Sequence, residues 1–202
     1  MKRNIGVWKR IEGVLISCLL FVFLTGCNEE ITLQDGTNLQ LDKEGGVTVT
    51  YIEEFPSDYY DVAELQAMNA EEVAEYNAKA GEEAVTVVST VTDGSKITLA
   101  MHFADMEDYG DMNGLPVYSG TVSQAQAMGY DLNRIFTDAK TGEQLADINW
   151  DDLANKHIVI ISGEVTLYPY NKIEMVTENV TVSEDRKMAT VTGEEQEVIV
   201  FK

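Results

Sequence analysis

The stretch that decides the fold is residues 85–103, which read VTVVSTVTDGSKITLAMHF. Two candidate strands, 85–91 and 97–103, flank the turn 92–96, which contains Asp93-Gly94. Apolar and polar side chains alternate along the second run, with Ile97, Leu99, Met101 and Phe103 on one face. An Asp-Gly turn between alternating runs predicts an antiparallel hairpin with one buried face.

The segment before this hairpin, residues 61–80, carries a helical pattern. Asp61 can cap the N-terminus with Glu64 three positions on, and Gly81 provides a C-terminal stop. Apolar side chains recur at near-helical spacing, which predicts one principal amphipathic helix packed on a sheet. These positions are Val62, Leu65, Met68, Val73 and Tyr76.

Further toward the N-terminus, residues 31–34 and 39–41 alternate on either side of Asp35-Gly36, and a second turn at 43–46 leads into 47–51. This pattern predicts a small antiparallel meander. Part of 31–41 can instead serve as a tether.

The C-terminal half is rich in short strand patterns. Thr121 with Gln124 resembles a capping box, and Asn149 can cap another short helix. Strands are expected at 132–136, 157–161, 164–170, 173–176, 180–182, 188–191 and 198–201, with a hairpin around Ser162-Gly163. Since strands outnumber helices, we predict the α+β class with a mainly antiparallel sheet, one principal helix at about 61–80 and short helical segments.

The first 27 residues carry a separate pattern. Lys2, Arg3, Lys9 and Arg10 precede an apolar run at 14–24, which is short for a membrane-spanning helix but fits the apolar region of a secretory signal. The run ends in Leu24-Thr25-Gly26-Cys27. This ending resembles the lipobox of bacterial lipoproteins.

The resemblance implies that a signal peptidase recognises Leu24, Thr25 and Gly26 and cuts before Cys27, whose thiol carries a diacylglyceryl group. Two acyl chains hold a protein stably on a membrane. The expected organisation is a signal peptide at 1–26, a lipidated N-terminus, tether and first hairpin at 27–46, and a single globular domain at 47–202. The alternative is an uncleaved anchor helix over 1–24. The expected location is the extracytoplasmic side of a bacterial membrane.

Charge limits the partners. Residues 27–202 hold ten basic and 34 acidic residues, a net charge of −24. Such a charge repels nucleic acids and anionic headgroups. It is interpreted either as a means of solubility at a crowded surface or, more specifically, as a cation site or a surface for a basic partner. Cys18 leaves with the signal and Cys27 is the lipid site, so no disulfide is expected.

Catalytic patterns are absent from the sequence. It contains neither Gly-x-Ser-x-Gly nor a phosphate-binding glycine loop, and its two histidines, His102 and His157, lie in predicted strands. We therefore predict no catalytic residues, no enzyme activity, and no cofactor beyond the acyl lipid at Cys27. A pair of carboxylates for glycan hydrolysis is left open, because 34 acids allow pairs at any separation.

Two further candidates are noncatalytic. An irregular calcium loop is one hypothesis; its oxygen ligands would be Asp105, Glu107, Asp108, Asp111 and Asn113, which do not follow the EF-hand spacing. Eight aromatics can either form a stacking surface for sugar or peptide or pack half-buried. These are Tyr59, Tyr60, Tyr109, Tyr118, Tyr130, Trp150, Tyr168 and Tyr170.

Together these observations favour a lipid-anchored envelope or cell-surface protein that binds a ligand or an envelope protein without catalysis. One alternative is a structural or assembly accessory of a membrane complex. Another is a hydrolase of glycans or cell wall.

Overall fold

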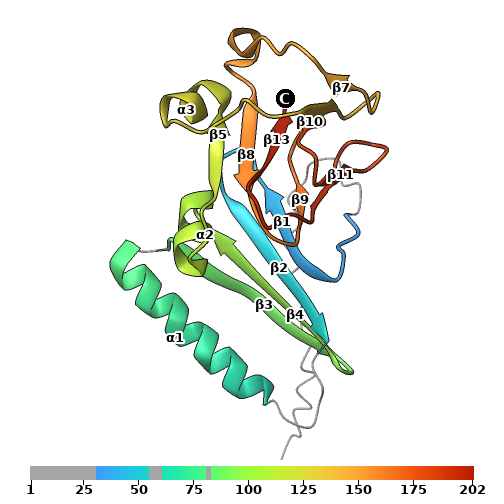
Figure 1. The fold of residues 1–202 in the computed structure, drawn as a ribbon. Coiled ribbons are helices and arrows are strands. Elements are labelled where there is room, and N and C mark those ends of the chain that lie inside the picture. The colour runs from blue at the N-terminus through green and yellow to red at the C-terminus, as the bar shows by residue number, and fades with distance from the viewer. Residues whose placement is uncertain (1–30, 55–60, 81–82) are drawn as a thin grey trace, which may run out of the picture. The chain divides into compact units, whose positions relative to one another are not determined.

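Two sheets build the fold in the computed structural model, which describes residues 31–54, 61–80 and 83–202 (Figure 1). The strands are β1 (Gly36–Leu41), β2 (Val47–Glu54), β3 (Val85–Asp93), β4 (Lys96–Phe103), β5 (Tyr118–Thr121), β6 (Phe136–Asp138), β7 (Gln144–Leu145), β8 (His157–Ile161), β9 (Val165–Tyr168), β10 (Ile173–Val176), β11 (Val180–Val182), β12 (Ala189–Val191) and β13 (Glu197–Phe201). The helices are α1 (Val62–Ala80), α2 (Met106–Asn113) and α3 (Val122–Ala127), with a 3₁₀ turn, η1 (Trp150–Leu153). Residues Leu33–Lys202 form one unit.

The larger sheet has seven strands in the order β11-β12-β9-β1-β2-β4-β3, and the smaller has six in the order β5-β8-β13-β10-β6-β7. Every pairing is antiparallel except that of β1 with β9. The predicted α+β class with mainly antiparallel strands is therefore confirmed, but the strands form two sheets where one was expected.

The hairpin of residues 85–103 is confirmed. β3 and β4 pair from Val85 with Phe103 to Asp93 with Lys96, and Gly94 has a φ of 62° in the turn. Of the four predicted core side chains, Ile97, Met101 and Phe103 are buried and Leu99 is half-buried. Alternation thus identified both the hairpin and its inner face.

The predicted hairpin around Asp35-Gly36 is wrong. β1 pairs instead with β2, and residues 31–34 are not a strand. The fully buried Asn38 explains this: its side chain accepts a bond from Gln34 N (2.9 Å) and donates to Gln34 O (2.7 Å). The backbone before Gly36 is thereby held by a side chain. β1 itself is the middle strand of the larger sheet.

Two expectations in the C-terminal half are also wrong. Residues 132–135 belong to no strand, and the strand there is the later β6. No hairpin forms around Ser162-Gly163, because β8 belongs to the smaller sheet and β9 to the larger. Gly163, with a φ of 97°, lies where the chain changes sheets. The later expected strands are present as β10 to β13.

The main core is shared by the two sheets. Buried side chains of β1, β2 and β4 belong to one apolar cluster with those of β8, β10 and β13. The largest fully buried members include Leu39, Phe103, Ile161, Ile199 and Phe201. The other face of the smaller sheet has its own cluster, formed with α3 and its surroundings. Because both of its faces are covered, all five residues of β13 are buried.

The short helices begin where the sequence predicts. Thr121 and Gln124 form the capping box of α3, and the Asn149 side chain accepts a bond from Asp151 N at the start of η1. These local side-chain bonds satisfy backbone groups that have no partner inside the helix.

The principal helix is also confirmed, but it packs more loosely than expected. None of its residues is buried, and Met68 on the predicted apolar stripe is 53% exposed. α1 runs beside β3 (Figure 1), where Asn77 donates to Val85 O (2.8 Å) and accepts from Val85 N (2.9 Å). Among the described helices, none is long and apolar enough to cross a membrane.

Candidate functional site

The predicted calcium ligands lie on or beside α2. Asp105 is its N-cap and accepts a bond from Asp108 N (2.9 Å), while Gly114 ends the helix in the left-handed region with a φ of 65°. Met106, Tyr109 and Gly110 are the buried side of the helix. Its acidic side chains therefore lie on the remaining, outer side.

This arrangement does not support the calcium hypothesis. The segment is a helix and not a loop, Asp108 accepts a bond from the Tyr76 hydroxyl (3.0 Å), and the Asn113 amide donates to Tyr109 O (2.8 Å). Within the described residues, no group of three or more His, Cys, Asp or Glu side chains is placed to hold a metal ion.

A groove of about 480 Å³ lies against the acidic side of α2. We call it the α2–β5 groove. It is lined by Gly45, Asp105, Met106, Glu107, Gly110, Asp111, Leu115, Pro116, Val117, Tyr118, Ser119, Met128, Tyr130 and His157. Val117 packs on the main core and Tyr118 and Tyr130 on the second, so the groove lies where the two clusters approach each other.

The floor of the groove depends on a close approach at Gly110. A Cβ placed there would lie 2.6 Å from Val117 Cγ2 and 2.8 Å from Leu115 O. Leu115 N also donates to Gly110 O (2.8 Å), which fixes the chain as it leaves α2. Only glycine allows the helix and the following segment to lie this close.

The lining of the groove also contains aromatic and apolar side chains. The rings of Tyr118 and Tyr130 pack with centroids 4.9 Å apart. Met128 nearby is 66% exposed and Leu115 is 38% exposed. Large apolar side chains exposed beside a concavity are a feature of binding surfaces.

The electrostatic field along α2 is negative. Three carboxylates line the groove, and no Lys or Arg of the described residues does. The ion pairs of the described residues lie elsewhere, at Lys96–Asp35, Arg134–Glu197 and Lys156–Glu174. The pKa of Tyr76 is raised to about 12, first by burial, then by its bond to Asp108 and by the charges of Asp108, Asp111 and Asp105.

The two histidines each contact a hydroxyl group. His102 Nδ1 lies 3.3 Å from Thr48 Oγ1, and His157 Nδ1 lies 2.8 Å from the Tyr170 hydroxyl. Burial lowers the pKa of His157, which also packs against Phe201. Within the described chain, these contacts join each imidazole to a threonine or a tyrosine and not to a serine.

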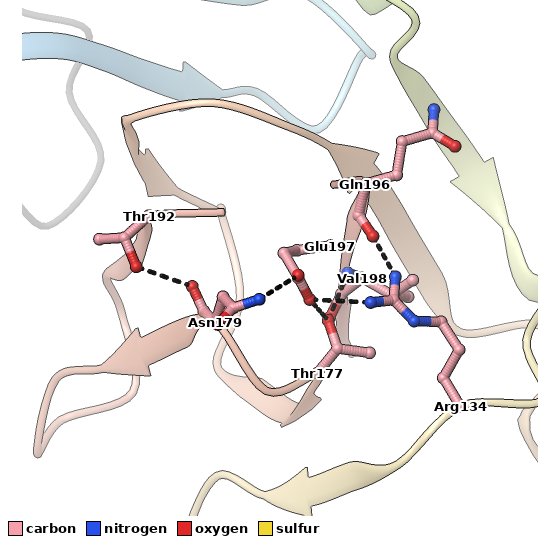
Figure 2. A network of polar contacts seen from close by, with 7 residues as sticks. All are labelled: Arg134, Thr177, Asn179, Thr192, Gln196, Glu197 and Val198. Carbon is pink, nitrogen blue, oxygen red and sulfur yellow. Dashed lines mark hydrogen bonds and ion pairs between the residues drawn. The ribbon is translucent and has the colours of Figure 1, made fainter. Parts of the chain in front are cut away.

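A buried carboxylate lies in the smaller sheet. Glu197, at the start of β13, is fully buried and accepts bonds from Asn179 Nδ2 (2.8 Å), Arg134 Nη2 (3.3 Å) and the Thr177 hydroxyl (Figure 2). Arg134 also donates to Gln196 O, and Thr177 Oγ1 accepts from Val198 N (2.8 Å). Figure 2 shows these side chains pointing toward one another from separate segments.

This network is closed. Both oxygens of Glu197 are occupied by protein donors, and a Cβ on Gly193 would lie 3.1 Å from Oε1. A carboxylate held in this way cross-links its segments, and Glu197 is not among the residues that line the α2–β5 groove. We therefore assign it to the architecture of the protein, and the α2–β5 groove is the candidate site.

Comparison of the chain with models of protein families, with curated proteins and with solved structures finds no match. Leu24, Thr25, Gly26 and Cys27, and the aromatics Tyr59 and Tyr60, lie outside the described residues.

The sequence identified the acidic residues of the groove as candidates, but it did not predict the groove. It grouped Asp105, Glu107 and Asp111 by proximity in the chain and included Tyr118 and Tyr130 in a general aromatic set. The structure brings these two groups together in one groove. The Glu197 network had no sequence signal, because its residues are separated by up to 63 positions.

Proposed function

We propose that this protein is a lipid-anchored envelope protein that binds a partner through the α2–β5 groove and catalyses no reaction. The observation that carries the proposal is the groove itself, which combines carboxylates that form no ion pair among the described residues with exposed apolar side chains. Concave surfaces with a few convergent charged groups are typical of binding sites.

The membrane part of the proposal depends on the sequence. Leu24-Thr25-Gly26-Cys27 follows a basic and then an apolar segment, as in bacterial lipoproteins. Acylation at Cys27 would hold the folded unit, Leu33–Lys202, on the extracytoplasmic side of the membrane. Its net negative charge would keep it away from anionic headgroups.

The anchor is tested by growing cells with labelled palmitate. We expect the full chain to take up label and to fractionate with membranes, and the Cys27→Ser variant to take up none. Cys18→Ser is the matched control, because that thiol precedes the cleavage site. Equal labelling of all three chains would overturn the assignment.

The groove is tested with a photo-crosslinking amino acid in place of Met128, in the full chain on intact cells. The control replaces Thr141, which is also exposed and lies in the β6–β7 turn at the other edge of the smaller sheet. We expect a discrete adduct at position 128 and none at 141. The same adducts at both positions would reflect random contact and would contradict the proposal.

One observation favours the alternative of an assembly accessory. β3 is an edge strand that exposes Val87, Val88 and Val91, at 40%, 59% and 56%. Exposed apolar edge strands are templates for pairing with another chain. If this surface carries the function, Val88→Lys with Val91→Lys will abolish co-purification with a membrane complex, and Met128→Lys will not.

A further inference from the structure

Resting on the proposed function, we infer that the α2–β5 groove binds a polypeptide segment that carries lysine and arginine side chains. The inference combines the groove itself, its acidic, aromatic and apolar lining, and the absence of a lysine or arginine among the described residues that line it.

Three carboxylates line the groove, and two of them lie one helical turn apart on α2. Glu107 and Asp111 are four residues apart on α2, so they lie on the same side of the helix one turn apart. Asp105 lies at its N-terminus, and all three residues are exposed. Because none forms an ion pair within the described chain, a basic ligand would not have to displace an internal partner.

The aromatic and apolar lining residues suit the rest of a long basic side chain. Lysine and arginine carry apolar stems that cover apolar surface, and Leu115 and Met128 offer such surface. Their cationic groups are attracted to aromatic faces, here those of the paired Tyr118 and Tyr130. A small inorganic cation would contact the carboxylates but not these apolar and aromatic side chains.

Charge also argues against two other occupants. A second copy of this chain carries the same strong negative charge and would be repelled. An acidic peptide or a nucleic acid would face the carboxylates of α2 with no lysine or arginine in the lining to offset them. A basic polypeptide has the complementary charge.

The experiment measures binding of a fluorescent peptide in which lysine and arginine alternate with glycine and serine. The full-length chain is held in neutral detergent, and binding is followed by anisotropy at low and high salt. Comparison ligands are a charge-inverted peptide with glutamate and aspartate, and spermidine. We expect the basic peptide alone to bind well, and binding to weaken as salt screens the charges.

The decisive comparison uses two double variants with the same change in net charge. Glu107→Gln with Asp111→Asn should weaken binding by about tenfold or more, because each substitution replaces a charged hydrogen bond to the peptide with a neutral one. Glu71→Gln with Glu72→Gln, on exposed positions of α1, should change it by no more than about twofold. Tyr130→Leu should weaken binding by about threefold through the lost ring face. Thermal melts confirm that each variant is folded.

Equal weakening by both double variants would show attraction by the overall charge and overturn the inference. Binding of the acidic peptide, or of spermidine as tightly as the basic peptide, would also overturn it. If the basic peptide fails to bind while the position-128 adduct forms, the groove binds a partner of other chemistry and the proposed function stands. If both fail, both proposals fall.

Discussion

Glu197 and Arg134 form the most deeply buried of the three ion pairs in the described chain, with Oε2 3.3 Å from Nη2 and the carboxylate side chain 0% exposed. The pair joins β13 to the loop before β6, and Asn179 extends it to the turn between β10 and β11. A buried ion pair is not itself proof of stability, but its removal on one side leaves an uncompensated charge.

Replacement of this carboxylate tests its structural role. We expect Glu197→Gln to lower the free energy of unfolding by about 3–5 kcal/mol. Arg134 would lose its counter-charge, and the NH₂ group of the new glutamine would face a side chain that also donates. The measurement is equilibrium unfolding in urea. Glu195→Gln, at an exposed position two residues earlier, is the control and should stay within about 0.5 kcal/mol. Similar effects of the two changes would contradict a buried network.

Gly110 tests the contact between α2 and the floor of the groove. In most helices Gly→Ala stabilises by about 1 kcal/mol. Here the new Cβ would meet Leu115 O at 2.8 Å, a backbone atom that cannot rotate away. We therefore expect Gly110→Ala to destabilise by about 1–3 kcal/mol. Glu107→Ala in the same helix reports helix propensity alone, and a stabilised Gly110→Ala variant would show that the approach is not tight.

Asn77 tests how α1 is held beside β3. Its side chain makes both hydrogen bonds to Val85, while the other contacts of α1 come from the half-buried Val73 and Tyr76, since no residue of the helix is fully buried. Asn77→Ala should increase hydrogen exchange throughout α1 and lower stability by about 1–3 kcal/mol. The control is Lys79→Ala, because Lys79 is exposed and lies near the end of the same helix. Unchanged exchange in α1 would mean that the apolar stripe alone fixes the helix.

His157 gives a pH dependence of defined sign. Burial lowers its pKa below 6.5, so the unfolded chain binds a proton more readily than the folded one. The stability contributed by the neutral imidazole is complete above pH 6.5 and is lost as the pH falls through 6.5 toward the folded pKa. Urea unfolding at neutral and mildly acidic pH should show a smaller acid loss for His157→Gln than for the parent chain. An equal loss in both would assign the acid sensitivity to other groups.

Local signals in the sequence predicted the elements that depend on neighbouring residues. The Asp93-Gly94 turn with alternation over 97–103 gave the β3–β4 hairpin, and Thr121 with Gln124 gave the start of α3. Backbone angles and side-chain caps act within a few residues, so they can be inferred from a short stretch. The same holds for α1 and most strands of the C-terminal half.

Only the tertiary structure decided how these elements combine. Asp35-Gly36 has a turn pattern, yet Asn38 holds the preceding backbone and β1 pairs with β9 across the sequence. Gly163 lies at a change of sheet and not in a hairpin. The buried Glu197 and the groove joining Asp111 to Tyr130 likewise bring together residues far apart in the chain. Strand pairing, burial and charge complementarity are non-local free energies, and a short stretch does not contain the residues that determine them.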